Sequence, residues 1–343
     1  MKILLSSEVA EEVSEILQLL PRDSDILISI PDNIAQPDVT GFSNVTVVIS
    51  KQAAAGSKFE KMRGLLRFLS QARSFGPDVL ISGFPLLKHR VLSQFSKIDH
   101  IAYIRGLMFD SAVRGGFSDR LEASIIRRFL PRKVGKSLHA DYFLTTSEIN
   151  RKYLEERGFG TDQITLCGPV WLIDYPREVK HRNDIKRIII CTSALAAHGH
   201  VEQHEQMLVE FASAIELLRH DYALALRVHP RDHHDYQRDV RFANIPIIVG
   251  SAREFLDVAT NTDVLLSHPS TLLYEAGYLG VRSLVLFGES VLQSLRSLEA
   301  AGLATVELSQ LPTEVLARAS APDAFSEIDP TCLSRILDRI KIS

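Results

Sequence analysis

The segment Asp263–Phe287, DVLLSHPSTLLYEAGYLGVRSLVLF, decides the fold of this chain. Its pattern predicts an apolar strand, a turn, a helix that begins at Ser270 and Thr271, and a second apolar strand. The two hydroxyls and the unpaired backbone N–H groups of a helix start can hold an anion. Glu275 follows one helical turn later, near the same face. This order is typical of a nucleotide site in an α/β protein, and ordinary helix capping is the alternative.

The composition is that of a globular protein with two domains. A chain of 343 residues, 45% hydrophobic and 24% charged, is too long for one ordinary core. The net charge of −3 produces no field that favours nucleic acid, so no nucleic-acid partner is expected. The N-terminus lacks a signal-peptide pattern, no apolar run is long enough to span a bilayer, and the three cysteines are isolated. We therefore expect a cytoplasmic protein without disulfides.

Short apolar runs alternate with helical patterns along the whole chain. Strands separated by helices predict a parallel sheet covered on both faces. The polar stretch 176–187 divides two such series, and we predict an α/β fold of two Rossmann-like domains, residues 1–176 and 177–343, that face a central cleft. A helical pattern from Leu333 to Ile340 predicts a C-terminal helix that could pack back on the N-terminal domain.

A second motif, Leu226–Arg231, ends a predicted strand with a His-Pro step. The imidazole of His229 at this strand end could donate to a diphosphate or stabilise a leaving phosphate, and Arg227 adds positive charge. A structural histidine that caps the turn is the alternative. His268, which also precedes a proline, lies in the turn before the predicted anion-binding helix.

The loop after Cys191 follows the first strand of the second domain. Its Thr192 and Ser193 are candidates for contact with phosphate. Three histidines follow, two of them one helical turn apart, but no carboxylate or cysteine completes a recognisable metal-ligand set. The three histidines are His198, His200 and His204, and we predict no metal site at them.

The first domain offers candidates for the other half of a reaction. Arg105 ends a predicted strand and enters a glycine-rich loop that suits substrate binding. Asp110 and Asp119 lie in that loop, and Glu8 follows the first strand. We take Asp110 and Glu8 as candidate general bases, and Arg105 and Asp119 as candidate acceptor-binding residues. Solvation of the loop is the alternative for each carboxylate.

A basic stretch with apolar anchors, Arg127–Lys136, continues this loop region. Such a segment could contact an anionic membrane surface, which would place the protein at the inner face of the cytoplasmic membrane, or it could contact an anionic acceptor. A surface helix with one solvated face is the alternative.

These motifs together resemble the two-domain glycosyltransferases of the GT-B fold. The segment Thr271–Gly280 is similar to their nucleotide-sugar signature, which implies that the helix start holds the diphosphate and Glu275 holds the ribose. The stretches Ala140–Ser147 and Gly168–Asp174 are similar to the end of their N-terminal domain. The resemblance covers most of the chain in order, although each motif is short.

The Arg-Val-His-Pro step at His229 resembles the His-Pro motif of bacterial surface-polysaccharide transferases, which include sialyl-, polysialyl-, Kdo- and glycerophosphate transferases. A downstream Ser/Thr motif of those enzymes is matched by Ser270 and Thr271. Their acidic Asp/Glu-Asp/Glu-Gly motif is not evident here, so the identity of the general base stays open. The chain also resembles the non-hydrolysing UDP-GlcNAc 2-epimerases, but it has Ser267–Ser270 in place of their Asp-Ser-Gly-Gly turn and lacks their Gly-Thr-Arg-Pro-Glu.

The leading hypothesis is a glycosyltransferase that needs neither metal nor cofactor. It would move a sugar from a CMP- or UDP-sugar donor to a glycan or glycolipid acceptor in surface-polysaccharide synthesis. An epimerase of the UDP-GlcNAc 2-epimerase type and a non-catalytic nucleotide-binding scaffold are the alternatives. The donor sugar, the acceptor and the stereochemical outcome stay open.

Overall fold

The computed structural model describes residues 1–32, 36–50, 58–106, 140–175, 185–260, 262–291, 295–321 and 325–342. The chain divides into two compact units. The first contains the described parts of Met1–Arg105, residues 140–171, and residues 326–342. The second contains Gly106 and the described parts of Leu172–Phe325. The domain boundary predicted after residue 176 falls among residues that the structure does not describe.

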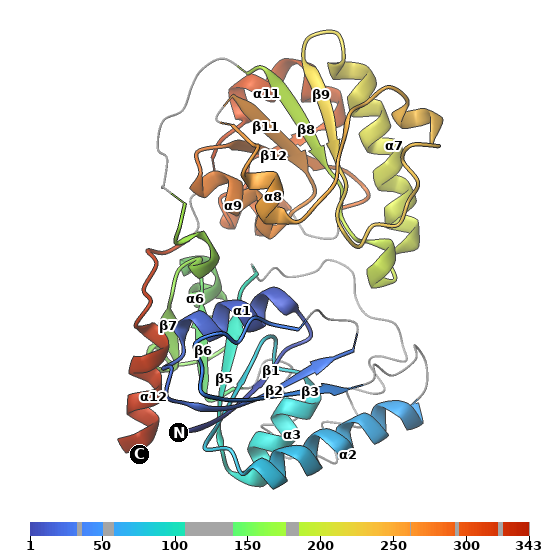
Figure 1. Cartoon of the computed structure of the whole chain (residues 1–343). Coiled ribbons are helices and arrows are strands. Elements are labelled where there is room, and N and C mark those ends of the chain that lie inside the picture. Colours follow the sequence, from blue (N-terminus) through green and yellow to red (C-terminus); the bar gives the residue numbers. More distant parts are fainter. Residues whose placement is uncertain are drawn as a thin grey trace. The chain divides into compact units, whose positions relative to one another are not determined.

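Within its described residues, the first unit has a seven-stranded sheet in the order β3-β2-β1-β4-β5-β6-β7 (Figure 1). All neighbouring strands are parallel. The strands are β1 (Lys2–Ser6), β2 (Asp25–Pro31), β3 (Asn44–Ser50), β4 (Val79–Ser82), β5 (Asp99–Ile104), β6 (Tyr142–Thr145) and β7 (Ile164–Leu166).

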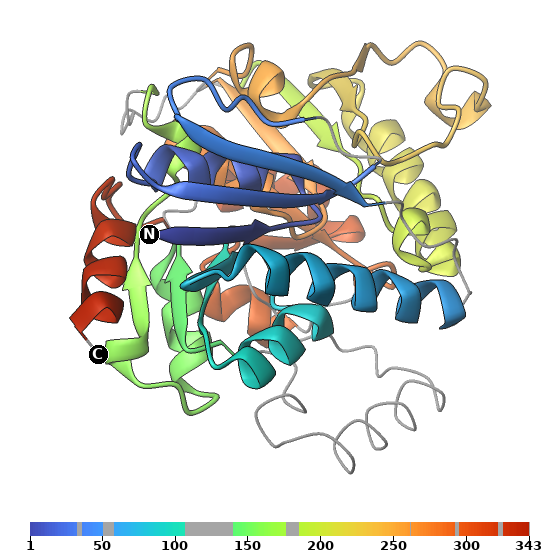
Figure 2. The same cartoon turned by 60° about the horizontal axis from the view of Figure 1, so that its bottom comes forward.

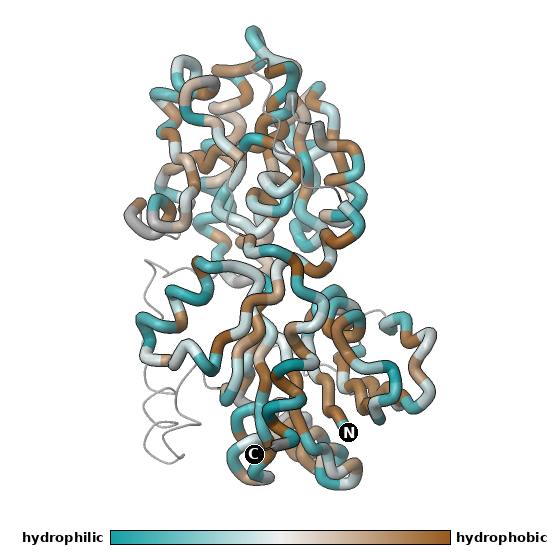
Figure 3. Tube along the Cα trace, turned by 90° about the vertical axis from the view of Figure 1, so that its left-hand side faces the viewer, coloured by the Kyte–Doolittle hydropathy of each residue, from teal (hydrophilic) through white to brown (hydrophobic). Residues whose placement is uncertain are grey.

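Helices cover both faces of this sheet because successive strand residues point to opposite sides. Ile3 and Leu5 of β1 pack with α1 and α12, whereas Leu4 packs with α2 and α3 on the other face. Figure 2 shows α2 and α3 beside each other, and Figure 3 shows the hydrophobic chain that leads from the N-terminus into the sheet. The helices are α1 (Ala10–Leu19), α2 (Lys58–Phe75), α3 (Leu87–Ser96), α6 (Glu148–Glu155) and α12 (Cys332–Ile342), with short 3-10 turns at Thr161–Gln163 and Val170–Leu172.

The second unit repeats this design with a six-stranded parallel sheet among its described residues, in the order β10-β9-β8-β11-β12-β13. The strands are β8 (Arg187–Cys191), β9 (Ala223–Arg227), β10 (Ile247–Ile248), β11 (Asp263–Ser267), β12 (Arg282–Phe287) and β13 (Thr305–Glu307).

The helices α7 and α11 share one buried cluster with the strands of this second sheet. Ile188 and Ile190 of β8 face that cluster and pack with Phe211 of α7 and Leu311 of α11. The helices are α7 (Val201–Leu218), α8 (Ala252–Leu256), α9 (Thr271–Tyr278), α10 (Leu295–Ala300) and α11 (Leu311–Arg318), with 3-10 turns at Ala196–His198, Val240–Phe242 and Leu308–Gln310.

The predicted fold class is confirmed: the chain consists of two α/β units, each built on a parallel sheet. The predicted C-terminal helix is α12, and it packs against α1, β6 and β7 of the first unit. Helix α7 begins at Val201, so His204 belongs to this helix, and its side chain is buried. None of the helices in the described part of the chain is both long and apolar enough to cross a membrane.

Candidate functional site

The carboxyl edge of the second sheet brings together three turns that carry candidate residues. In the strand order, the chain winds outward from β8 in one direction through β9 and in the other through β11, which makes this the switch point of the sheet. Register places Arg227, Cys191 and Ser267 side by side at the last positions of β9, β8 and β11. The turns that begin after these residues are therefore neighbours, and ligands of open α/β sheets bind at such an edge.

The turn after β9 fixes the ring of His229. Its backbone N–H donates to Thr192 Oγ1 at 2.9 Å, and its Nδ1 accepts from the backbone N–H of Arg231 at 3.1 Å. An imidazole that accepts at Nδ1 carries its proton on Nε2 when it is neutral. A neutral His229 therefore carries its ring proton on Nε2, and the residue is half-buried.

Arg227 supplies positive charge at the same edge. Its side chain is buried, its guanidinium lies 5.2 Å from the ring centroid of Phe255, and its Nε has no hydrogen-bond partner within the described chain. A buried cation whose donors are not all used attracts an anion. Ser193 is half-buried in the adjacent turn after β8.

The turn after β11 leads into α9 through Ser270, which is the N-cap residue. Its side chain makes no capping hydrogen bond, and Oγ is buried without a partner among the described residues. Ordinary capping therefore does not account for Ser270, and its hydroxyl is left for another acceptor or donor. Thr271 is the first helical residue, and Glu275 is buried one turn later in α9.

His268, in the same turn, is a neutral histidine. It is buried, its ring lies 5.3 Å from the ring of Phe211, and its Nε2 lies 2.8 Å from Ser290 Oγ. Ser290 also donates its hydroxyl proton to the buried Glu210, so it accepts from the Nε2–H of His268. Burial lowers the pKa of His268 to about 4, and the nearby His204 adds to this effect. His268 therefore places an uncharged polar side chain beside the start of α9.

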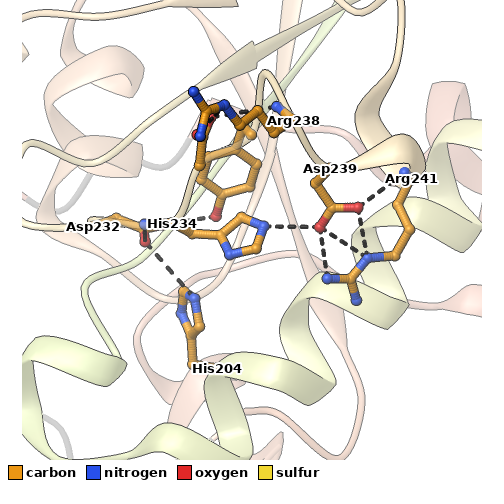
Figure 4. A network of polar contacts seen from close by, with 8 residues as sticks. His204, Asp232, His234, Arg238, Asp239 and Arg241 are labelled. Carbon is orange, nitrogen blue, oxygen red and sulfur yellow. Dashed lines mark hydrogen bonds and ion pairs between the residues drawn. The ribbon is translucent and has the colours of Figure 1, made fainter.

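The chain that follows His229 is anchored to α7 and to itself by a polar network (Figure 4). Tyr236 donates to Asp232 at 2.7 Å, and His204 Nε2 of α7 lies 3.8 Å from Asp232 Oδ1. Beyond it, the carboxylate of Asp239 binds His234 Nε2 at 2.8 Å and also pairs with Arg241, and this ion pair lowers the pKa of Asp239. Sequence analysis missed this network. Its only local signal was the density of charged residues and histidines between 229 and 241.

The described residues contain no group of three or more His, Cys, Asp or Glu side chains arranged to hold a metal ion. His200 is the half-buried N-cap residue of α7, and His204 one turn later faces Asp232.

The first sheet has its own switch point, between β1 and β4. Glu8 follows β1; it is exposed and pairs with Lys88 at 3.2 Å. Arg105 follows β5 and donates to the buried Glu15 at 2.8 Å, while its guanidinium lies 4.3 Å from the ring of Trp171. The candidates Asp110 and Asp119 and the basic stretch Arg127–Lys136 lie outside the described residues.

Glu12 is the residue of this first edge that sequence analysis missed. It lies in the first turn of α1, and Ser7 Oγ donates to its Oε2 at 2.5 Å. Burial raises the pKa of Glu12 above its ordinary value of 4.5, although the Ser7 hydroxyl and Arg105 act in the opposite direction. In the sequence, an acid in the first turn of a helix is the usual partner of the helix dipole, so nothing local distinguished Glu12.

Comparison with known proteins yields relatives in structure alone. No family model matches the chain, and no curated protein matches it in sequence. The UDP-GlcNAc 2-epimerase of Methanocaldococcus jannaschii, solved with UDP-GlcNAc and UDP, has a TM-score of 0.61 at 15% identity over 100% of both chains. The UDP-GlcNAc 2-epimerase of Neisseria meningitidis, bound to UDP-GlcNAc, has a TM-score of 0.60 at 13% identity over 100% of both chains. The glycotransferase of kitacinnamycin has a TM-score of 0.59 at 14% identity over 99% of this chain and 98% of its own.

These structures share the GT-B-like fold of this chain, and they overturn the leading hypothesis from sequence. The prediction of a CMP- or UDP-sugar glycosyltransferase was wrong as the first choice, because the similar structures are mainly UDP-GlcNAc 2-epimerases. None of the similar structures named here is a sialyl- or Kdo-type transferase. The physical reason is that His229-Pro230 and Ser270-Thr271 mark strand ends and a helix start, which any sheet of this topology needs. Such local steps do not separate one chemistry from another.

Proposed function

We propose that this chain is an enzyme that binds a UDP-sugar and inverts the configuration at C2 of the sugar, as a UDP-GlcNAc 2-epimerase does. The observation that carries the proposal is the second sheet's switch-point edge. There, Arg227, the Nε2–H of His229 and the uncapped Ser270 hydroxyl gather on neighbouring turns. The similar structures that contain UDP or UDP-GlcNAc support UDP as the nucleotide.

The chemistry of the reaction explains why such an edge is needed. The hydrogen on C2 of a nucleotide sugar is not acidic, because C1 is an acetal carbon and not a carbonyl. It becomes acidic when the bond from C1 to the diphosphate oxygen weakens, and that requires donors that stabilise the departing diphosphate. His229, Ser270 and the start of α9 are donors of this kind. The steps are redox neutral, so the proposal includes no cofactor.

The turn Ser267–Ser270 departs from the Asp-Ser-Gly-Gly turn of the epimerases, and the departure has a specific consequence. A glycine turn binds phosphate through backbone N–H groups, whereas this turn places a buried neutral His268 and a free hydroxyl beside the helix start. In the proposal, hydroxyl donors therefore replace part of the backbone contact with the phosphate.

The first experiment measures nucleotide binding. Thermal unfolding is recorded with UDP, CDP, CMP and GDP at equal concentration. At a hundred times its dissociation constant, a ligand of the native state adds about 2.7 kcal/mol to the free energy of unfolding. We expect UDP to give the largest shift. Equal shifts for all four nucleotides, or none, would remove the basis of the proposal.

The second experiment measures turnover. The protein is incubated with UDP-GlcNAc in D₂O without any acceptor, and proton NMR follows the C2 epimer and the incorporation of deuterium at C2. We expect both. Binding of UDP with neither epimer nor deuterium exchange contradicts the enzyme assignment and favours a non-catalytic nucleotide-binding protein.

A further inference from the structure

The backbone of His229 is held on both sides by residues of its own unit. Its N–H donates to Thr192 Oγ1 at 2.9 Å, and its carbonyl oxygen accepts from the backbone N–H of Asp232 at 2.8 Å. The second of these bonds closes a β-turn whose second residue is Pro230, a position that suits the fixed φ of proline. The place of the imidazole in the second unit therefore depends on Thr192 and Asp232.

The hydroxyl of Tyr236 joins these two supports. It donates to Asp232 Oδ2 at 2.7 Å and makes a side-chain hydrogen bond with Thr192. Burial raises the pKa of Tyr236 well above its ordinary value, and the bond to Asp232 adds to this effect, so the phenol keeps the proton that it donates. The four residues thus form a hydrogen-bonded ring that begins at the N–H of His229, passes through Thr192, Tyr236 and Asp232, and ends at the carbonyl of His229.

Packing alone does not explain a tyrosine at position 236. Its aromatic group is buried and lies 4.7 Å from the ring of His234 and 5.0 Å from the ring of Phe242, measured between centroids. A phenylalanine would keep both contacts. A buried hydroxyl costs free energy unless it is hydrogen-bonded, and a buried carboxylate such as Asp232 needs its donors even more. What the hydroxyl of Tyr236 adds is therefore the closure of the hydrogen-bonded ring.

We propose that Tyr236 is a positioning residue that fixes His229 for its contact with the diphosphate. This rests on the function proposed above, in which the Nε2–H of His229 donates to that group. Tyr236 itself does not contact the nucleotide; it acts through Thr192 and Asp232, which hold the backbone of His229. The imidazole is tied to the same turn, because its Nδ1 accepts from the backbone N–H of Arg231 at 3.1 Å. A shift of the turn therefore moves the donor, and a misplacement of about 1 Å can lower turnover by roughly 10²-fold.

A purely structural role for Tyr236 is the alternative, and it predicts a different dependence on His229. If the hydroxyl only stabilises the turn, its loss lowers the free energy of unfolding whether or not an imidazole is present. If it positions His229, its loss weakens nucleotide binding only while the imidazole is there to be displaced. Two residues that act through one contact give non-additive effects, which a double-mutant cycle measures.

The experiment is a double-mutant cycle on the affinity for UDP, measured by isothermal titration calorimetry with the full chain. We expect Y236F to raise the Kd of UDP about tenfold, H229A to raise it at least as much, and the double variant to match H229A. Y222F is the matched control: Tyr222 is half-buried just before β9, and no hydrogen bond to its hydroxyl is found within the described chain. A wild-type Kd in Y236F, or a tenfold loss that persists when residue 229 is alanine, overturns the proposal.

A second pair of variants covers the case in which Y236F does not fold. T192V removes the hydroxyl that accepts from His229, whereas T192S keeps it. We expect T192V to weaken UDP binding as Y236F does, and T192S to recover most of the affinity. Wild-type affinity in T192V, or a loss that persists in the H229A background, overturns the proposal.

The two proposals fail differently. Wild-type protein that does not bind UDP overturns both of them. Protein that binds UDP but does not epimerise UDP-GlcNAc overturns the epimerase function, while the UDP cycle still decides the role of Tyr236. An active epimerase whose Y236F variant keeps the wild-type Kd and kcat overturns the role of Tyr236 alone.

Discussion

The two sheets share one topology, but their switch-point edges carry opposite chemistry. The first edge presents carboxylates, of which Glu12 is held by a serine and Glu15 by an arginine and a tyrosine. The second presents an arginine, a donating His229 and the Ser270 hydroxyl, with a neutral histidine behind them. One edge presents acids and the other presents hydrogen-bond donors, so one fold carries different chemistry at the same position in each unit.

The largest effect should come from the second edge. H229A removes the Nε2–H that we assign to the leaving diphosphate, and the loss of one such donor lowers turnover by roughly 10²- to 10³-fold. Its backbone contact with Thr192 is kept, so stability should change little. The measurement is initial-rate kinetics with UDP-GlcNAc. H220A is the matched control, because His220 is exposed in the turn just after α7. Equal rates in the two variants would show that the second edge does not stabilise the leaving group.

The next effect concerns the neutral state of His268. Its pKa is lowered from 6.5 to about 4 in the folded protein, so the unfolded chain binds its proton first as the pH falls. This contribution is fully present above pH 6.5, declines as the pH drops toward 4, and amounts to on the order of 3 kcal/mol. Urea unfolding at pH 7.5, 5.5 and 4.5 should therefore show a steeper acid loss for the wild type than for H268Q. Parallel curves for the two proteins would mean that His268 is charged in the native state.

A smaller effect than that of His268 should come from the first edge. G83A places a methyl group against Glu12 Oε2, and the flexible end of that side chain can move away, so the free energy of unfolding should fall by only about 1 kcal/mol. Urea unfolding of G83A and of the wild type measures this change. G64A in α2 is the control, because its Cβ meets nothing within 4 Å. A loss of several kcal/mol in G83A would show that the Glu12 carboxylate cannot move away from the added methyl group.

Much of the fold and half of the candidate site could be predicted from sequence, for a physical reason. Alternating apolar runs report local burial, so strands such as β11 and helices such as α12 were predicted close to their observed bounds. His229 and Ser270 were found because each directly follows a strand and precedes a turn. Their common edge follows from the parallel sheet.

The remaining features depend on contacts that no local pattern encodes. Ser290 meets Glu210 and His268 from positions 80 and 22 residues away in the chain. Glu12 becomes distinct only because the turn after β4, about seventy residues later, closes on it. Sheet order creates these contacts, and sequence periodicity does not reveal which strand ends become neighbours.

The route of the chain also has a consequence for biosynthesis. The first unit takes its last helix from residues made after the whole second unit, and Cys332, Leu333 and Ile336 of that helix complete its core. A ribosome makes residues in order, so the second unit can fold while the core of the first unit still lacks α12. Until the final segment emerges, the nascent first unit exposes the apolar face that α12 will cover.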